Sequence, residues 1–186
     1  RLIGELPAGG KMLAVFAPLD RLQPILDSYP DLSLAALNGT HIVVSGTESA
    51  IVELQEKMPD GLRSKMLTTS HAFHSQLMEP ALQPFQQIVD EVAFTKARLP
   101  LVCNVSGQVL AAETELDGHY WARHIREPVQ FADSIRCVAE NNCDMILEIG
   151  PQGILTRMAA AVWEGPAASL VSCLQLKVDD EDSVLS

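Results

Sequence analysis

The sequence predicts an α/β protein organised as two units, and two observations support this prediction. In the first third of the chain, short apolar segments alternate with amphipathic ones, and the pair Asn38-Gly39 separates two of the apolar segments. In the rest of the chain, apolar strands and helical segments alternate one by one, which is typical of a parallel α/β layer. The 186 residues suffice for one compact domain or two small ones.

The first unit is predicted over residues 11–69. Leu22, Ile25 and Leu26 give its first helix one apolar face, and Thr47 is suited to cap its second helix. Asn-Gly is a strong hairpin signal because both residues tolerate positive φ. The predicted elements are strand 11–17, helix 19–29, strands 32–38 and 41–46, helix 48–58 and strand 62–69. Their order, βαββαβ, is the ferredoxin-like pattern.

The second unit opens with a helix predicted over 75–94, in which apolar residues from Met78 to Val92 recur near helical spacing. Pro80 and Pro84 weaken its first turns, and Pro128 is expected to break a later helical segment. The other predicted elements are a buried strand within 99–107 that ends in a turn, a short helix before Pro128, a second helix after it, a strand within 144–153 that ends in a Gly-Pro loop, helix 154–163 and strand 169–176. The helix after Pro128 is expected to turn Phe131, Ile135, Val138 and Ala139 inward.

The charge of the chain argues against a nucleic-acid partner. Lys and Arg number 13 and Asp and Glu number 24, which gives a formal net charge of −11. Nucleic-acid binding needs a cationic surface instead. No apolar run approaches the roughly 20 residues of a membrane span, so no membrane partner is expected.

The cysteine spacing and the first residues of the chain bear on the cellular compartment of the protein. Cys103, Cys137, Cys143 and Cys173 form no CxxC pair and have no zinc-ligand spacing, so we expect free thiols in a reducing cytoplasm. The segment that begins at Arg1 has no signal-peptide pattern. Both ends look cut, and we expect a piece of a longer polypeptide.

The segment TTSHAFHS, residues 68–75, lies where the two predicted units meet, and such junctions favour binding sites. Imidazole is the side chain best suited to general base catalysis near neutral pH, which makes His71 and His74 candidates. The chain has no GxSxG nucleophile elbow, and no third or fourth ligand suggests a metal. From these residues alone, a structural or capping role for either histidine stays open.

Six longer motifs follow one another at sensible spacings: LPAGGKMLAV, LAALNGTHIVVSG, SHAFHSQLMEPAL, LPLVCNVSG, YWARHIREPVQFADSI and LEIGPQGILTRM. Together they resemble the acyltransferase domain of a modular type I polyketide synthase, of the malonyl-CoA:acyl carrier protein transacylase family. The resemblance covers nearly the whole chain. It implies a large α/β-hydrolase-like subdomain with a small ferredoxin-like insert. Residues 11–69 would then be the insert, 70–174 the C-terminal part of the large subdomain, and 175–186 the start of the linker that follows.

The resemblance also implies a ping-pong reaction in the biosynthesis of an antibiotic or other secondary metabolite. A serine in a GHSxG elbow takes malonyl from malonyl-CoA and passes it to the phosphopantetheine arm of an acyl carrier protein. No tightly bound cofactor is needed, and His74 would be the general base. His71 and Phe73 would line the acyl pocket, since HAFH resembles the malonyl type of this signature and YASH the methylmalonyl type.

Other positions carry over from the family in the same way. Asn38 matches an asparagine near the active site, and His124 matches the position whose main-chain carbonyl orients the catalytic imidazole. The implied partners are the acyl carrier protein and the neighbouring ketosynthase with its linker.

The chain departs from the family because it contains neither the GHSxG serine nor the arginine that pairs with the malonyl carboxylate. We therefore expect it to be inactive alone. An alternative is a non-catalytic module of a fatty acid or polyketide synthase that docks a carrier protein through Arg123, Arg126 and Arg136. A third possibility, a free-standing ferredoxin-like binding domain, is opposed by the second unit.

Overall fold

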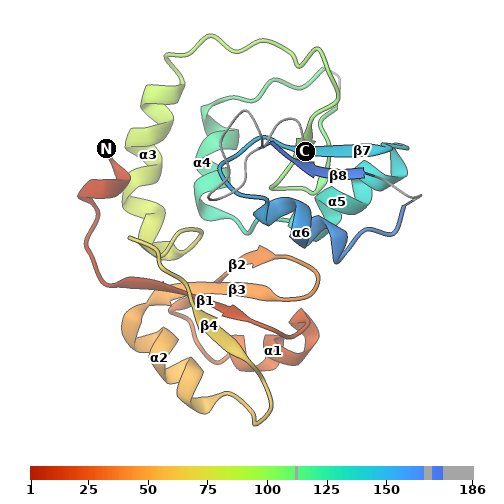
Figure 1. The fold of residues 1–186 in the computed structure, drawn as a ribbon. Helices are drawn as coiled ribbons and strands as arrows, with labels where there is room; N and C mark the ends of the chain where they lie inside the picture. The colour runs from red at the N-terminus through yellow and green to blue at the C-terminus, as the bar shows by residue number, and fades with distance from the viewer. Residues whose placement is uncertain (112, 166–168, 174–186) are drawn as a thin grey trace.

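A computed structural model describes residues 1–111, 113–165 and 169–173 (Figure 1). After a short 3-10 helix, η1 (Ile3–Glu5), the first unit follows the predicted order. Its elements are β1 (Gly10–Val15), α1 (Leu19–Leu26), β2 (Leu32–Leu37), β3 (Ile42–Thr47), α2 (Glu48–Lys57) and β4 (Ser64–Met66). The strands lie in the order β2-β3-β1-β4, and every neighbouring pair is antiparallel. This is the ferredoxin-like arrangement predicted from the sequence.

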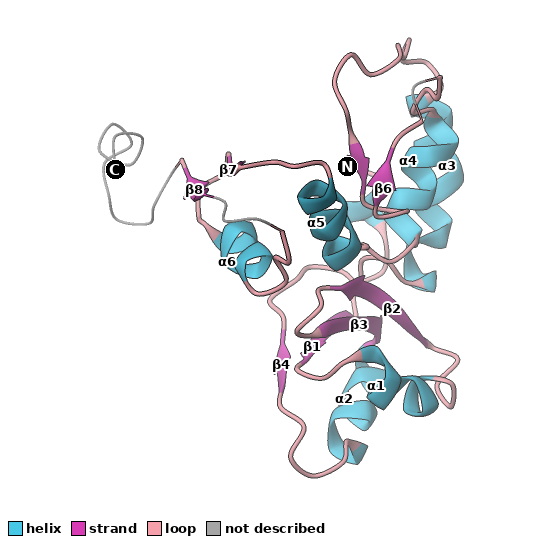
Figure 2. Ribbon diagram, turned by 90° about the vertical axis from the view of Figure 1, so that its right-hand side faces the viewer, coloured by secondary structure: helices cyan, strands magenta, loops and turns pink. Residues whose placement is uncertain are grey.

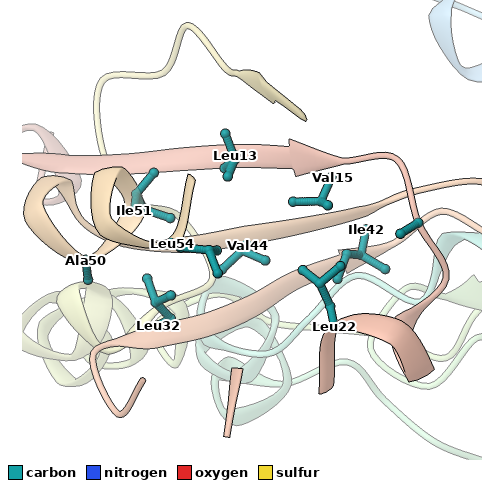
Figure 3. Packing of buried hydrophobic residues seen from close by; sticks show 10 residues of the cluster. Leu13, Val15, Leu22, Leu32, Ile42, Val44, Ala50, Ile51 and Leu54 are labelled. Carbon is teal, nitrogen blue, oxygen red and sulfur yellow. The ribbon is translucent and has the colours of Figure 1, made fainter. Parts of the chain in front are cut away.

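The helices α1 and α2 cover one face of this sheet, and the second unit lies on the other side of it (Figures 1 and 2). The core between sheet and helices is apolar and almost closed to solvent (Figure 3). Thr47 caps α2, as predicted, by accepting a hydrogen bond from the amide of Ala50 at 3.3 Å. The fully buried members of this core are Leu13, Val15, Leu22, Val44, Ile51 and Leu54.

The predicted hairpin turn is present between β2 and β3. The amide of Asn38 donates to the carbonyl of His41 at 3.0 Å, and Gly39 has a φ of +81°. A side chain at Gly39 would also collide with Val162 of the second unit. Glycine is therefore required here both for its backbone conformation and for the close approach of the two units.

The second unit contains more short elements than the sequence predicts. They are η2 (Gln76–Met78), α3 (Glu79–Val89), β5 (Val102–Cys103), β6 (Gln108–Val109), α4 (Gly118–Arg126), α5 (Phe131–Glu140), β7 (Met145–Glu148), α6 (Ile154–Ala160) and β8 (Ser169–Ser172). The break at Pro128 is confirmed between α4 and α5. Ile135 and Ala139 are buried, and Phe131 and Val138 are partly buried.

Two predictions about the second unit are wrong. The helix expected over 75–94 begins as a 3-10 turn and ends at Val89, and Val92 is exposed. The buried strand expected within 99–107 is only β5, which forms an antiparallel hairpin with β6, and Leu99 is 79% exposed. An apolar run identifies a strand only if a neighbour covers it, and none of the described residues covers Leu99.

The parallel layer is confirmed for β7 and β8, which pair in parallel register. One face of this pair carries Met145, Leu147, Ile149 and Val171, and all four side chains are exposed. Parallel strands are normally covered on both faces. None of the described residues covers this apolar face.

The described residues contain free cysteines at all four positions, with Cys103 and Cys137 buried. They contain no cluster of three or more potential metal ligands, and no helix among them is long and apolar enough to cross a membrane. The final predicted strand ends at Ser172, and the linker predicted over 175–186 lies outside the described residues.

Candidate active site

The histidine segment is held where the two units meet. Gly10, the first residue of β1, lies so close to Ala72 that a side chain at position 10 would come within 2.6 Å of the Ala72 Cβ. The buried Ser75 hydroxyl donates to the carbonyl of Ala72 at 2.7 Å and accepts from the amide of Leu77 at 3.2 Å. These contacts fix the chain on either side of His74.

His74 itself has a φ of +59°, in the left-handed region that residues other than glycine seldom adopt. Its amide donates to the carbonyl of Ile125 at 3.2 Å, which ties the unusual backbone to the end of α4. Backbone conformations of this kind cluster at functional sites, where the surrounding structure maintains them.

The His74 ring is oriented by a main-chain carbonyl. Nδ1 lies 2.8 Å from the carbonyl oxygen of Glu127, and since a carbonyl can only accept, Nδ1 carries the proton. In the neutral ring, Nε2 is then an acceptor, and it has no hydrogen-bond partner among the described residues. Burial lowers the pKa of His74, and the main-chain carbonyls of Glu127 and His124 only partly oppose this effect. The ring is thus neutral near pH 7, with one nitrogen free to take a proton.

The sequence led us to expect the orienting carbonyl from His124. That carbonyl is close enough to raise the pKa of His74, but the 2.8 Å hydrogen bond comes from Glu127, three residues later. The signal for Glu127 was present in the sequence. A residue that precedes proline is forced out of helical conformation, and Glu127 before Pro128 is extended, with φ −82° and ψ 155°. This turns its carbonyl away from the helix axis.

The side chain of His124 lies beside His74, with ring centroids 6.3 Å apart. Tyr120 and Trp121, one turn earlier on α4, pack against the His124 ring at 6.1 and 5.6 Å. The structure therefore brings together the two histidines that the sequence singled out from motifs fifty residues apart.

His71 is bonded differently from His74. Its Nε2 donates to the carbonyl of Leu6 at 3.4 Å, and its Nδ1 accepts from the Ser70 hydroxyl at 3.1 Å. Both nitrogens are therefore engaged. Phe73 lies edge-on to the His71 ring, with centroids 6.2 Å apart, and packs against the small cluster of Met12, Ala35 and Val43.

Asn38 is buried in the hairpin turn, where its side-chain nitrogen Nδ2 lies 2.9 Å from Nε2 of His41. No hydrogen bond joins it to His74 among the described residues. Arg123 forms two hydrogen bonds with Glu127, at 2.6 and 2.9 Å, and Arg126 pairs with Glu79 of α3 at 3.2 Å. Both arginines near the histidines are therefore already paired with carboxylates.

Comparison with known proteins identifies the family. The family model described as the acyl transferase domain matches residues 1–184 of the sequence. The chain belongs to the acyl transferase domain family. Polyketide synthase GfsA of Streptomyces halstedii is 35% identical over the whole chain, and mycoketide-CoA synthase of Mycobacterium tuberculosis is 36% identical over 94% of it. The acyltransferase domain from the second module of the salinomycin polyketide synthase superposes on 99% of the chain with a TM-score of 0.92 and 34% identity.

These matches confirm the resemblance and the α/β fold class predicted from the sequence. They also show how much of each relative the chain covers. It spans 3% and 4% of the two curated polyketide synthases and 44% of the solved acyltransferase domain. The activity, substrates and partners of a whole acyltransferase domain are therefore matters for proposal.

Proposed function

We propose that this chain is the part of a polyketide synthase acyltransferase domain that carries the general base, His74. The observation that supports this most is the hydrogen bond from Nδ1 of His74 to the Glu127 carbonyl, which leaves Nε2 free and unprotonated. His71 has both nitrogens engaged and is the poorer candidate for a base. In the family, the base serves a serine that lies outside this chain.

In the proposed reaction, Nε2 of His74 takes the proton of the serine hydroxyl as its oxygen attacks the thioester carbonyl of malonyl-CoA. The imidazolium then returns the proton to the leaving CoA thiolate. In the second half, the same nitrogen takes the proton of the phosphopantetheine thiol of the carrier protein as that sulfur attacks the malonyl-serine ester, and the proton returns to the serine. The Glu127 carbonyl holds the ring in the required tautomer through both halves, without changing its own charge.

The test of this role is loss of the base in the complete acyltransferase domain that contains the chain. His74→Ala should reduce self-acylation by malonyl-CoA by several orders of magnitude, because it removes one member of a nucleophile–base pair. His119→Ala is a matched control, since His119 is an exposed imidazole on α4. Acyl loading of His74→Ala within threefold of wild type, measured by intact-protein mass spectrometry, would exclude His74 as the base. The 186-residue chain alone should not become acylated, because it lacks the nucleophile.

The proposed substrate is malonyl-CoA, and Phe73 is the proposed determinant. Its ring is braced by Met12, Ala35 and Val43 on one side and by His71 on another, so it cannot easily yield to an α-methyl branch. Changing His71→Tyr together with Phe73→Ser should raise the relative kcat/KM for methylmalonyl-CoA by roughly ten- to hundredfold, the scale of one methyl group in an apolar pocket. His71→Tyr alone is the control. An unchanged ratio in a folded double variant would place specificity elsewhere in the domain.

A second candidate function is docking of an acyl carrier protein without catalysis. Arg123 and Arg126 are the proposed contacts, since they lie on the helix whose end orients His74. Their ion pairs with Glu127 and Glu79 weigh against this function, because a paired arginine must exchange partners to bind an acidic protein. Mass spectrometry separates the two functions, since a docking module would carry no acyl group in the complete domain.

A further inference from the structure

The side chain of His124 is held against His74 by packing rather than by hydrogen bonds. The two imidazole rings meet edge to face, at an interplanar angle of 71°. Tyr120 and Trp121 pack on the same His124 ring, so it cannot swing away without disturbing three aromatic contacts. No hydrogen bond between the two imidazoles is present. Any influence of one ring on the other must therefore act through space, as charge.

His124 is also the group whose charge reaches His74. Among the described residues, it alone exerts a charge effect on the pKa of His74. Helix α4 packs against α3 and η2, and η2 carries no charged side chain. Five other charged or titratable groups near α4 contact partners other than His74. Arg123 pairs with Glu127, Arg126 with Glu79, and Tyr120 with Cys103. Asp117 caps α4, and Asp90 lies against its first turn, whereas His119 is exposed to solvent.

The two rings differ in how readily they take up a proton. Burial lowers the pKa of both His74 and His124. When both rings are charged, they repel one another equally, but His74 is the more deeply buried of the two, so charging it costs more, although the Glu127 carbonyl partly offsets this cost. The deeper burial of His74 favours His124 as the ring that takes up the first proton. A second proton on His74 would then have to enter beside an existing cation.

We propose that His124 is a positioning residue that acts on His74 through its charge, by taking up the first proton and so keeping the neighbouring imidazole neutral with Nε2 free. The consequence for catalysis rests on the proposed function of His74, but the coupling between the two rings does not. Two unit charges about 6 Å apart at a partly solvated site repel by the equivalent of about one pH unit. His124 therefore extends the working range of His74 by about one pH unit toward acid.

Histidine Cε1–H resonances report the two protonation states separately, and we would titrate them by NMR in the 186-residue chain and in the complete acyltransferase domain. In the wild-type protein, the midpoint of His124 should lie above that of His74. In His124→Gln, which keeps a polar side chain without the charge, the midpoint of His74 should rise by about one pH unit. In His124→Lys, which keeps a cation at position 124, it should stay at or below the wild-type value.

The acid limb of kcat/KM for self-acylation should move with the His74 midpoint, upward in His124→Gln and not in His124→Lys. A purely structural role would move both variants alike. Three results would overturn the proposal: His74 protonating before His124 in the wild type, a His74 midpoint in His124→Gln within about 0.2 pH unit of wild type, or equal shifts in both variants. The order of protonation is measured in the wild-type protein, so the proposal stays testable if a variant does not fold. Failure of the proposed function would instead appear as full activity in His74→Ala, with the NMR coupling intact.

Discussion

The contact between Gly10 and Ala72 offers a way to move His74 without changing any residue of the site. In Gly10→Ala, the new Cβ would lie 2.6 Å from the Cβ and 2.7 Å from the amide nitrogen of Ala72. Ordinary contact begins at 3.4 Å, so strand β1 and the histidine segment must separate by about 0.8 Å. Neither neighbour is the flexible end of a long side chain, and Ala72 is also anchored by Ser75.

The expected cost of this separation is about 2 kcal/mol, within the ~1–3 kcal/mol typical of an overfilled core. For a chain of this length, that corresponds to a fall of about 4–8 °C in Tm. A displacement of nearly 1 Å at a catalytic group also costs roughly a hundredfold in rate. We therefore expect self-acylation of the complete domain to fall by about that factor, with the loss in kcat rather than in KM.

The control is Gly4→Ala, because a Cβ at Gly4 meets no atom within 4 Å. Adding Ala72→Gly to Gly10→Ala should restore part of the loss, since it removes the closer of the two contacts but leaves the backbone one. Thermal unfolding and burst-phase acylation would measure both effects. A Gly10→Ala variant with the Tm and rate of wild type would refute the reasoning that this contact holds the histidine segment in place.

Three other predictions concern the surface of the second unit. Burial acts to raise the pKa of Glu148, but the hydrogen bonds that its carboxylate accepts from the first amides of α6 and from the Thr156 hydroxyl together hold this pKa below its usual value. Glu148→Gln should therefore cost about 0.5–1 kcal/mol in urea unfolding at pH 7, and less as the pH falls through the lowered pKa of the native carboxyl. Replacing Arg123 and Arg126 with Glu should raise the KM for the carrier protein and leave self-acylation nearly unchanged; equal losses in both would mean a structural role. The 186-residue chain should self-associate through the exposed apolar face that Leu147 of β7 and the adjacent Ile149 carry, and Leu147→Lys with Ile149→Lys should reduce this self-association in sedimentation velocity.

The sequence predicted the first unit well because its signals are local. Alternating apolar segments, the Thr47 cap and the Asn38-Gly39 turn each specify a conformation within a few residues, and the buried face follows from the same pattern. The segment around Leu99 failed for the opposite reason. Its apolar run reads as a buried strand, yet burial depends on a neighbour elsewhere in the chain, and periodicity carries no information about that neighbour.

The sequence selected candidate residues for the site but could not predict their contacts. The motifs selected His74 and His124, and the structure places their rings side by side. The hydrogen bond to Glu127 joins residues 53 positions apart, and sequence spacing cannot measure such a distance. Only the effect of Pro128 on the residue before it pointed in that direction, because that restriction is local.

The segment around Pro128 also joins the two units. The stretch from Ile125, in the last turn of α4, to Val129 makes two sets of main-chain hydrogen bonds. The carbonyls of Ile125 and Glu127 bind the amide and the ring of His74, and Val129 pairs with β2 by donating to Ala35 and accepting from Leu37, both at 2.9 Å. One short segment thus binds both His74 and the edge of the ferredoxin-like sheet. A change in how the units meet at β2 should therefore also turn the imidazole of His74, because the same segment makes both sets of contacts.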